Sequence, residues 1–124
     1  MNVVDSSAWL EFFADGPNAG YFSEAIQRTS QLLVPAITIF EVFKRVLQQR
    51  DESAALQATA IMQQGRLIAL DGPLALAAAK LSATTRLPLA DSIVLASARA
   101  YDAVLWTQDA DFEGLPNVKF RPKQ

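Results

Sequence analysis

Four carboxylates lie at positions where a fold of alternating strands and helices usually binds its ligands. They are Asp5, Glu41, Asp91 and Asp109. Asp5 and Asp109 each follow a short apolar run, whereas Glu41 and Asp91 each lie near the start of an expected helix. In an open parallel sheet such positions project toward the edge that forms the ligand crevice. Clustered carboxylates repel one another unless a divalent cation binds them. The pattern therefore predicts a site for Mg²⁺ or Mn²⁺, the cations that prefer oxygen ligands.

The absent residue types narrow the chemistry further. The chain contains no cysteine and no histidine, which excludes thiolate nucleophiles, disulfides and zinc-thiolate sites and removes the commonest general base. Carboxylates with hard cations are what remains. The net charge of −2, from 11 basic and 13 acidic residues, argues against a general polyanion binder, since such proteins are usually strongly basic.

The elements that position these acids alternate along the chain. With 124 residues, 51% of them hydrophobic, the composition predicts a single domain over residues 1–124. Apolar runs predict strands at 3–4, 32–34, 67–70, 103–106 and within the tail 117–122. Helices are expected at 8–13, 19–28, 38–47, 53–64 and 74–85, with a last one starting at Asp91. This order predicts an α/β fold with a parallel β-sheet of about five short strands sandwiched by helices.

Taken singly, several of these residues have a purely structural explanation. Asp91 comes shortly after Pro88 and is expected as the N-cap of its helix. Thr38 and Glu41 have the spacing of a capping box, which by itself would explain Glu41. Gly65 is expected as the C-cap of the helix at 53–64. The conjunction of four acids at one sheet edge favours the metal site over four independent caps.

An ordered set of motifs resembles a known family. The set comprises Val4-Asp5-Ser6-Ser7, the isolated Glu41, Leu87-Pro88-Leu89-Ala90-Asp91 and Thr107-Gln108-Asp109-Ala110-Asp111-Phe112. Together these resemble the PIN domain, in particular the VapC-type toxin ribonucleases of type II toxin–antitoxin systems, over essentially the whole chain. Trp106 departs from the resemblance, which leads us to expect a smaller aliphatic residue before Thr107.

The resemblance implies a function and a set of site residues. It implies a Mg²⁺- or Mn²⁺-dependent endoribonuclease that hydrolyses single-stranded RNA with metal-activated water and leaves 5′-phosphate and 3′-hydroxyl ends. The absence of histidine agrees with this route, because no imidazole pair is available to activate the 2′-hydroxyl. By matching position, the catalytic and metal-binding residues would be Asp5, Glu41, Asp91 and Asp109, with Ser6 and Thr107 orienting them and Asp111 supporting them through water.

The resemblance also implies partners. It leads us to expect single-stranded or loop RNA as the substrate, a cognate antitoxin that covers the active-site groove, and a homodimer. The helices at 19–28 and 53–64 are candidate docking surfaces, although core burial explains their apolar residues equally well. No segment approaches membrane-spanning length, and we expect a cytoplasmic protein without membrane contact.

Two other classes of protein remain open at this point. A non-catalytic PIN-like scaffold would bind RNA or protein without cleavage. A receiver-like signalling domain would use Asp71, after the apolar run 67–70, as its phosphoacceptor, but it requires a lysine that does not follow the strand at 103–106. Basic side chains could contact RNA phosphates, although a solvated surface role is favoured for each of Lys44, Arg45, Arg86, Arg99, Lys119 and Arg121.

Overall fold

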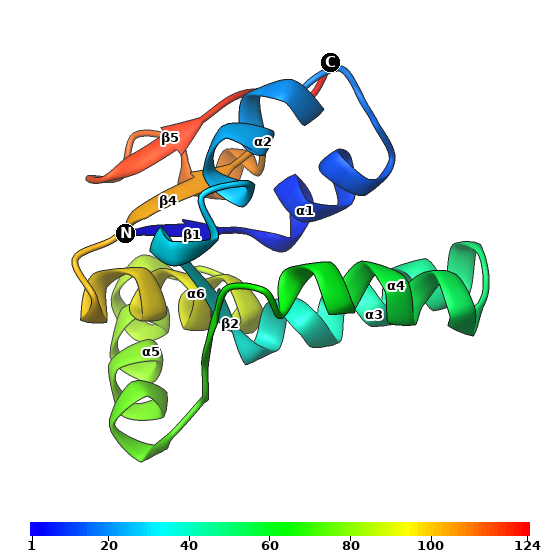
Figure 1. Cartoon of the computed structure of the whole chain (residues 1–124). Coiled ribbons are helices and arrows are strands. Elements are labelled where there is room, and N and C mark those ends of the chain that lie inside the picture. Colours follow the sequence, from blue (N-terminus) through cyan, green and yellow to red (C-terminus); the bar gives the residue numbers. More distant parts are fainter.

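The computed structural model describes all residues from Met1 to Gln124 and confirms the alternating order of elements. In chain order these are β1 (Asn2–Val4), α1 (Ser6–Phe13), α2 (Ala19–Ile26), η1 (Thr29–Gln31), β2 (Leu32–Pro35), α3 (Ala36–Gln49), α4 (Glu52–Met62), β3 (Arg66–Ile68), α5 (Gly72–Thr85), α6 (Leu89–Ala100), β4 (Val104–Thr107), η2 (Ala110–Phe112) and β5 (Val118–Phe120). The strands form one sheet in the order β3-β2-β1-β4-β5, and every pair of neighbours is parallel (Figure 1). The predicted α/β architecture is therefore confirmed.

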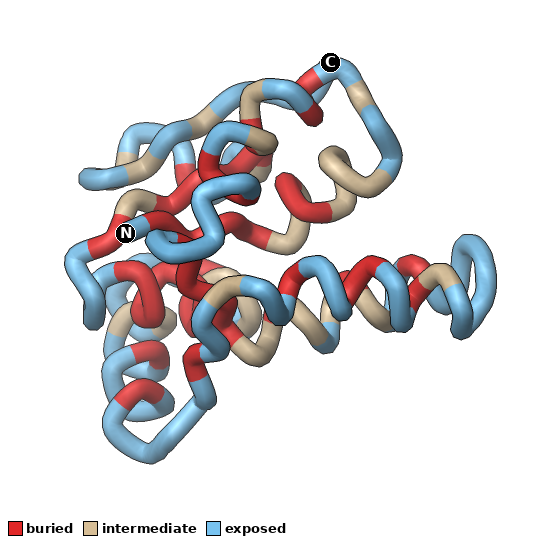
Figure 2. The backbone as a smooth tube through the Cα atoms, in the orientation of Figure 1, coloured by how far each residue is buried: buried red, intermediate tan, exposed pale blue.

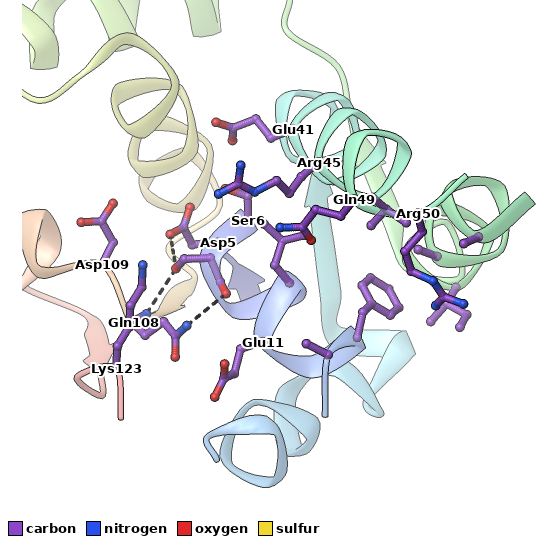
Figure 3. A pocket seen from close by; sticks show the side chains of 18 of the residues that line it. Asp5, Ser6, Glu11, Glu41, Arg45, Gln49, Arg50, Gln108, Asp109 and Lys123 are labelled. Carbon is purple, nitrogen blue, oxygen red and sulfur yellow. Dashed lines mark hydrogen bonds between the residues drawn. The ribbon is translucent and has the colours of Figure 1, made fainter. Parts of the chain in front are cut away.

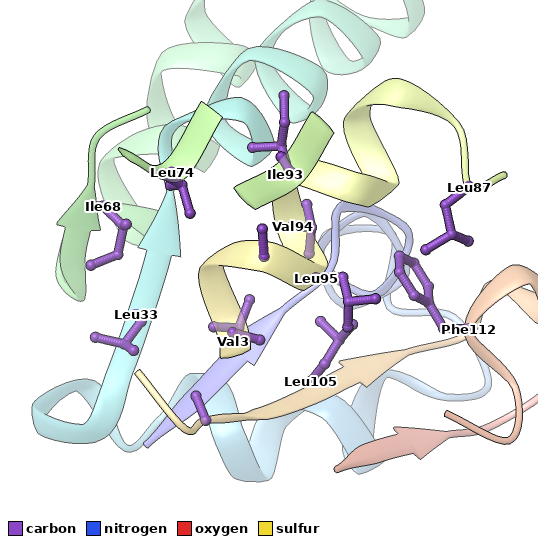
Figure 4. Packing of buried hydrophobic residues seen from close by; sticks show 14 residues of the cluster. Val3, Leu33, Ile68, Leu74, Leu87, Ile93, Val94, Leu95, Leu105 and Phe112 are labelled. Atoms are coloured by element: carbon purple, nitrogen blue, oxygen red, sulfur yellow. The ribbon is translucent and has the colours of Figure 1, made fainter. Parts of the chain in front are cut away.

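The central strands β1, β2 and β4 are buried on both faces, which explains why they are continuous apolar runs in the sequence. Successive residues of a strand point to opposite faces, so Val3 and Val4 enter different clusters. Val3 packs with residues of α5 and α6 on one face, as Figure 4 shows. On the other face Val4 packs with residues of α1 to α4, among them the buried Trp9 and Phe22. The sheet is thus the middle layer of a three-layer sandwich.

Helices α3 and α4 form a hairpin that projects beyond the sheet (Figure 1). The side chains between the two helices are buried, including Val42, Val46, Ala55 and Ala58. Figure 2 shows this pattern as a stripe of buried positions along the arm, with exposed positions on its outer side. The arm therefore carries its own extension of the core and presents a wall next to the sheet edge.

Two predicted helix caps are wrong, and both corrections affect site residues. Helix α6 begins at Leu89 with Pro88 as its N-cap, so Asp91 lies within the first turn rather than capping it. Helix α3 begins at Ala36, which places Glu41 in the second turn, and no capping box forms. The Thr38 hydroxyl instead donates a hydrogen bond to the carbonyl oxygen of Pro35 at 2.7 Å. Because both helices start earlier than expected, neither carboxylate is used as a cap.

Gly65 is not a helix C-cap either. Helix α4 ends with Gln63 as its C-cap. Gly65 instead lies against β2, where a Cβ atom would come within 2.9 Å of the Leu32 carbonyl oxygen and of Val34 Cγ2. The glycine is required by this close approach to a core strand, because the backbone oxygen of a paired strand has no room to move.

The large side chain of Trp106 fits the fold without distorting it. Trp106 is only 4% exposed, and its Nε1 donates a hydrogen bond to Asn2 Oδ1 at 2.9 Å. Its ring packs beside that of Tyr21, with centroids 5.2 Å apart. The tryptophan therefore points into the core face opposite the α5 and α6 layer, away from the polar residue that follows it in β4.

None of the helices is both long and apolar enough to span a membrane.

Candidate active site

Asp5 is the most deeply placed of the predicted acids. It follows β1 and precedes α1, with extended backbone geometry at the helix N-cap position, yet its side chain does not cap the helix. The carboxylate is only 2% exposed, and its Oδ2 accepts hydrogen bonds from Ser7 Oγ at 2.8 Å and from Thr107 Oγ1 at 2.9 Å. Thr107 reaches Asp5 because β4 lies next to β1 in the sheet. One neighbouring residue and one residue about a hundred positions away in the sequence therefore fix this carboxylate.

The other predicted acids come from separate elements and meet Asp5 at the same edge. Asp5, Glu41, Asp91 and Asp109 all line one groove, as Figure 3 shows for the three that it labels. Asp91, Asp109 and Asp111 each offer a carboxylate oxygen, and these oxygens lie within 4.8 Å of one another. Asp109 Oδ1 accepts a hydrogen bond from the Asp111 backbone N–H at 2.9 Å, which sets the start of η2. The structure thus brings the whole predicted quartet together, with Asp111 beside it.

Burial, together with the neighbouring negative charges, raises the pKa values of three carboxyl groups in the site. Burial raises the pKa of Asp5, and hydrogen bonds from Ser7 and Thr107 offset only part of the rise. Burial also raises the pKa of Glu41, helped by the charges of Asp5 and Asp109 and opposed by a hydrogen bond from Ser6. The pKa of Asp91 rises to about 7, first through burial and then through the neighbouring carboxylates. Without a cation, the site favours protonated acids over a full set of negative charges.

The donor set fits a divalent cation of the Mg²⁺ or Mn²⁺ type. Every candidate ligand atom is a carboxylate oxygen, and neither imidazole nor thiolate is present in the chain. Hard cations take such ligands, whereas zinc and copper sites usually include nitrogen or sulfur donors. A bound cation would also remove the repulsion that raises the pKa of Asp91. Asp91, Asp109 and Asp111, whose carboxylate oxygens lie close together, are therefore residues that could hold the ion, and Asp5 and Glu41 line the same groove.

The groove extends from the acids along the α3–α4 arm and has a volume of about 670 Å³. Its cationic side chains are Arg45, Arg50 and Lys123, and its apolar wall includes Leu10, Phe13, Val46, Ala58 and Ile61. Of the basic residues singled out from the sequence, only Arg45 lines the groove; Arg50 and Lys123 were not singled out. Of the two predicted docking helices, the one at 53–64 contributes to the groove wall, whereas the buried face of α2 belongs to the core.

Sequence reasoning selected Ser6 and passed over Ser7. It is Ser7 whose hydroxyl donates to Asp5 Oδ2, while Ser6 contributes a hydrogen bond to Glu41. Ser7 also lies 3.4 Å from Thr107 Oγ1 and accepts a hydrogen bond from the Gln108 backbone N–H at 3.4 Å. A signal existed, since serine two residues from an aspartate is a common partner for its carboxylate. Which of the two adjacent serines donates to Asp5 depends on the backbone geometry at the start of α1.

Asp71, the phosphoacceptor of the receiver-like alternative, does not join the acidic cluster. It is exposed, and its carboxylate accepts a hydrogen bond from the Leu74 backbone N–H at 2.9 Å, which makes it the N-cap of α5. The strand before it, β3, lies at the edge of the sheet. Asp71 is therefore explained by helix capping alone.

Replacing Thr107 by valine should weaken Mg²⁺ binding about 10- to 100-fold. The hydroxyl both donates to Asp5 and accepts from the Asp109 backbone N–H at 2.9 Å, so its loss leaves two candidate ligands without support. We also expect the free energy of unfolding to fall by about 1–2 kcal/mol. Titration calorimetry with MgCl₂ measures the first effect and urea denaturation the second. Thr84→Val is the matched control, since that exposed hydroxyl bonds only to carbonyl oxygens of its own helix; unchanged Mg²⁺ affinity in Thr107→Val would contradict the assignment.

A comparison with protein-family models matches most of the chain to one domain family. The model described as the PIN domain matches residues 3–118. A comparison with curated protein sequences produces no match.

Solved structures with the same fold belong to toxin–antitoxin proteins. A toxin–antitoxin complex from Klebsiella pneumoniae superposes with a TM-score of 0.81 at 23% identity, covering 96% of both chains. VapC20 from Mycobacterium tuberculosis, a sarcin-ricin loop cleaving toxin, gives 0.81 at 18% identity, covering 98% of this chain and 100% of its own. DNA-bound VapBC from Salmonella typhimurium gives 0.75 at 13% identity, covering 98% and 96%. At these identities the likeness concerns the fold.

Proposed function

Because this chain belongs to the PIN domain family, we propose that it is a metal-dependent endoribonuclease that cleaves single-stranded RNA and acts as the toxin of a VapBC-type toxin–antitoxin pair. The observation that carries the proposal is that four carboxylates from separate parts of the chain line one open groove. Burial and mutual repulsion raise the pKa of Asp91 in this set, so the ionised carboxylates do not stabilise the fold. A site that binds a cation explains why the acids stand together.

The residues of the site have different roles in the proposed reaction. Asp5, Glu41, Asp91 and Asp109 would hold Mg²⁺ or Mn²⁺, and Asp111 stands beside them. A bound ion of this kind lowers the pKa of water and stabilises the negative charge that develops on a leaving oxygen. Ser7 and Thr107 keep the Asp5 carboxylate oriented through their two hydrogen bonds. Since the chain has no histidine, we expect water to attack rather than the ribose 2′-hydroxyl, which leaves 5′-phosphate and 3′-hydroxyl ends.

We further propose a cognate antitoxin and a homodimer as the protein's partners. Relatives of the same fold are described as complexes of a toxin with its antitoxin, which supports the first. The apolar wall of the groove, with Leu10, Phe13 and Ile61, is a surface on which an apolar helix of an antitoxin could dock. Exposed apolar side chains outside the groove support the second, since Phe40 is 59% exposed on α3 and Leu89 is 73% exposed at the start of α6.

Purified protein should cleave a mixed pool of single-stranded RNA in the presence of Mg²⁺ or Mn²⁺ and not in the presence of EDTA. Sequencing of the product ends should find 5′-phosphates and 3′-hydroxyls, because hydrolysis by water leaves them. Products with 2′,3′-cyclic phosphates would contradict the mechanism. Folded, antitoxin-free protein that cleaves with neither cation would favour the non-catalytic scaffold instead.

The alternatives are less well supported. A non-catalytic scaffold has no use for carboxylates whose burial and mutual repulsion oppose their ionisation. The receiver-like interpretation is wrong, because the chain is a PIN domain and Asp71 serves as a helix cap.

A further inference from the structure

The segment that follows β5, residues 121–124, is held against β4 and α2 and brings Lys123 to the groove. The Arg121 backbone N–H donates to the Thr107 carbonyl oxygen at 3.0 Å, one residue beyond the strand pairing. The Arg121 guanidinium lies over the Tyr21 ring, 4.2 Å from its centroid. The Pro122 carbonyl oxygen accepts a hydrogen bond from Asn18 Nδ2 at 2.9 Å. Three consecutive contacts therefore hold the segment against β4 and α2.

Asn18 makes the most deeply buried of these contacts. It has no exposed surface and occupies the N-cap position of α2, but its side chain does not cap that helix. Instead, its amide group donates to Gln108 Oε1 at 3.1 Å as well as to Pro122. Its own backbone N–H donates to Glu11 Oε2 at 2.7 Å. The Asn18 side chain thus bonds to two partners about a hundred residues away in sequence instead of capping its own helix. These bonds fix the position of the C-terminal segment.

The next residue of this segment, Lys123, reaches into the groove. Figure 3 shows its side chain beside Gln108 and directed toward Asp109. The ion pair between Arg28 and Glu24 is the one salt bridge within 4.0 Å in the structure. The Lys123 ammonium thus stands next to the acids without being paired to any of them, and its hydrogens remain available to a ligand.

Cations flank the acids on both sides. Arg45 of α3 and Arg50, the C-cap residue of that helix, line the groove on the side of the arm, and they also lack a carboxylate partner within 4.0 Å. Lys123 lines it on the side of β4 and Asp109. The phosphate backbone of an RNA strand that crosses the acidic cluster would contact positive charges on both sides of that cluster. Contacts of this kind to phosphate position a nucleic acid without reading its bases.

We propose that Lys123 is a substrate-binding residue that contacts a backbone phosphate next to the cleaved phosphate of the RNA strand. Asn18 is the positioning residue that holds the segment carrying Lys123. The inference rests on the proposed ribonuclease function and extends it to a segment outside the matched residues 3–118. Lys123 replaces counterions on the strand when RNA binds, so its contribution depends on salt.

Steady-state cleavage of a fluorescent, mixed-sequence single-stranded RNA in Mg²⁺ at several KCl concentrations tests the role of Lys123. We expect Lys123→Gln to raise KM on the order of 5-fold with kcat within about twofold, and to reduce the salt slope of log kcat/KM by about 0.7. Lys123→Arg should retain wild-type values. Lys80→Gln, an exposed lysine on α5 outside the groove, is the matched control and should change neither quantity.

Each other outcome overturns a definite part of the proposal. Wild-type cleavage with unchanged KM and salt slope in Lys123→Gln would overturn the role of Lys123 and leave the ribonuclease function standing. Absence of cleavage by the wild-type protein would overturn the function and this inference together. If Asn18 acts through Lys123, the double variant Asn18→Ala/Lys123→Gln should have the KM of Lys123→Gln alone, and additive effects would overturn the positioning role.

Discussion

Asp5→Asn should lower the rate of Mg²⁺- or Mn²⁺-dependent RNA cleavage by about 10³-fold or more, which corresponds to about 4 kcal/mol of transition-state stabilisation. Asparagine keeps the shape of the side chain but loses the negative charge that a divalent cation needs. The fold should persist, since the pKa of the Asp5 carboxyl is raised by burial and a neutral side chain suits that environment. Cleavage rates measured with the same RNA pool, together with circular dichroism, separate lost activity from lost structure.

A matched control for this variant is available in the same chain. Asp102→Asn makes the same chemical change at an exposed position after α6. Asp102 has a φ angle of 50°, a conformation that asparagine adopts readily. The control should therefore fold and cleave like the wild-type protein. Equal cleavage by Asp5→Asn and wild-type preparations would point to a contaminating nuclease and contradict the assignment of the site.

In EDTA, the protein should lose stability as the pH rises from about 4 to about 7, and Asp91→Asn should remove part of that loss. The pKa of Asp91 in the folded protein is raised from 3.8 to about 7, mainly by burial and then by the charges of Asp5 and Asp109. The folded state therefore binds this proton more tightly than the unfolded chain does. Its contribution to stability is fully present below pH 3.8 and is lost as the pH passes through 7.

The effect is best measured as a difference between the two proteins. Because Asp91 is only half-buried, solvent screens much of the repulsion, and we expect Asp91→Asn to be more stable than wild type by about 1 kcal/mol at pH 8, or about 4 °C in Tm. Adding Mg²⁺ at pH 8 should raise the Tm of the wild type and raise that of the variant less. Thermal scans between pH 5 and pH 8 with EDTA or MgCl₂ measure both effects. Parallel pH profiles for the two proteins would contradict the raised pKa.

Most of the fold follows from local patterns in the sequence. Short apolar runs separated by amphipathic helices predict a parallel sheet, because strands buried on both faces contain few polar residues and the crossovers between them are helices. The structure confirms five strands in these places, although β3 ends at Ile68 rather than at residue 70. Helix starts were predicted less well, since the early starts of α3 and α6 depend on Pro35 and Pro88 acting as N-caps.

The candidate site was predictable where it depends on residue type and strand order. The lack of histidine and cysteine restricts the chemistry to carboxylates, and acids that follow parallel strands meet at one edge. Its supporting residues were predictable only in part. Arg50, Lys123 and Asn18 belong to none of the motifs, and Ser7 lies beside Ser6 in one of them. The positions of these four residues in the site depend on how segments far apart in the sequence pack together.

The sequence by itself therefore determined the class of fold and the chemical character of the site, because periodicity and residue type are properties of each short segment. Only the tertiary structure decided which groups touch. The hydrogen bond from Thr107 to Asp5 exists because β4 lies beside β1. The contact from Asn18 to Pro122 exists because the C-terminal segment packs over α2. Such contacts require side chains about a hundred residues apart to meet within hydrogen-bonding distance, and local pattern does not determine that geometry.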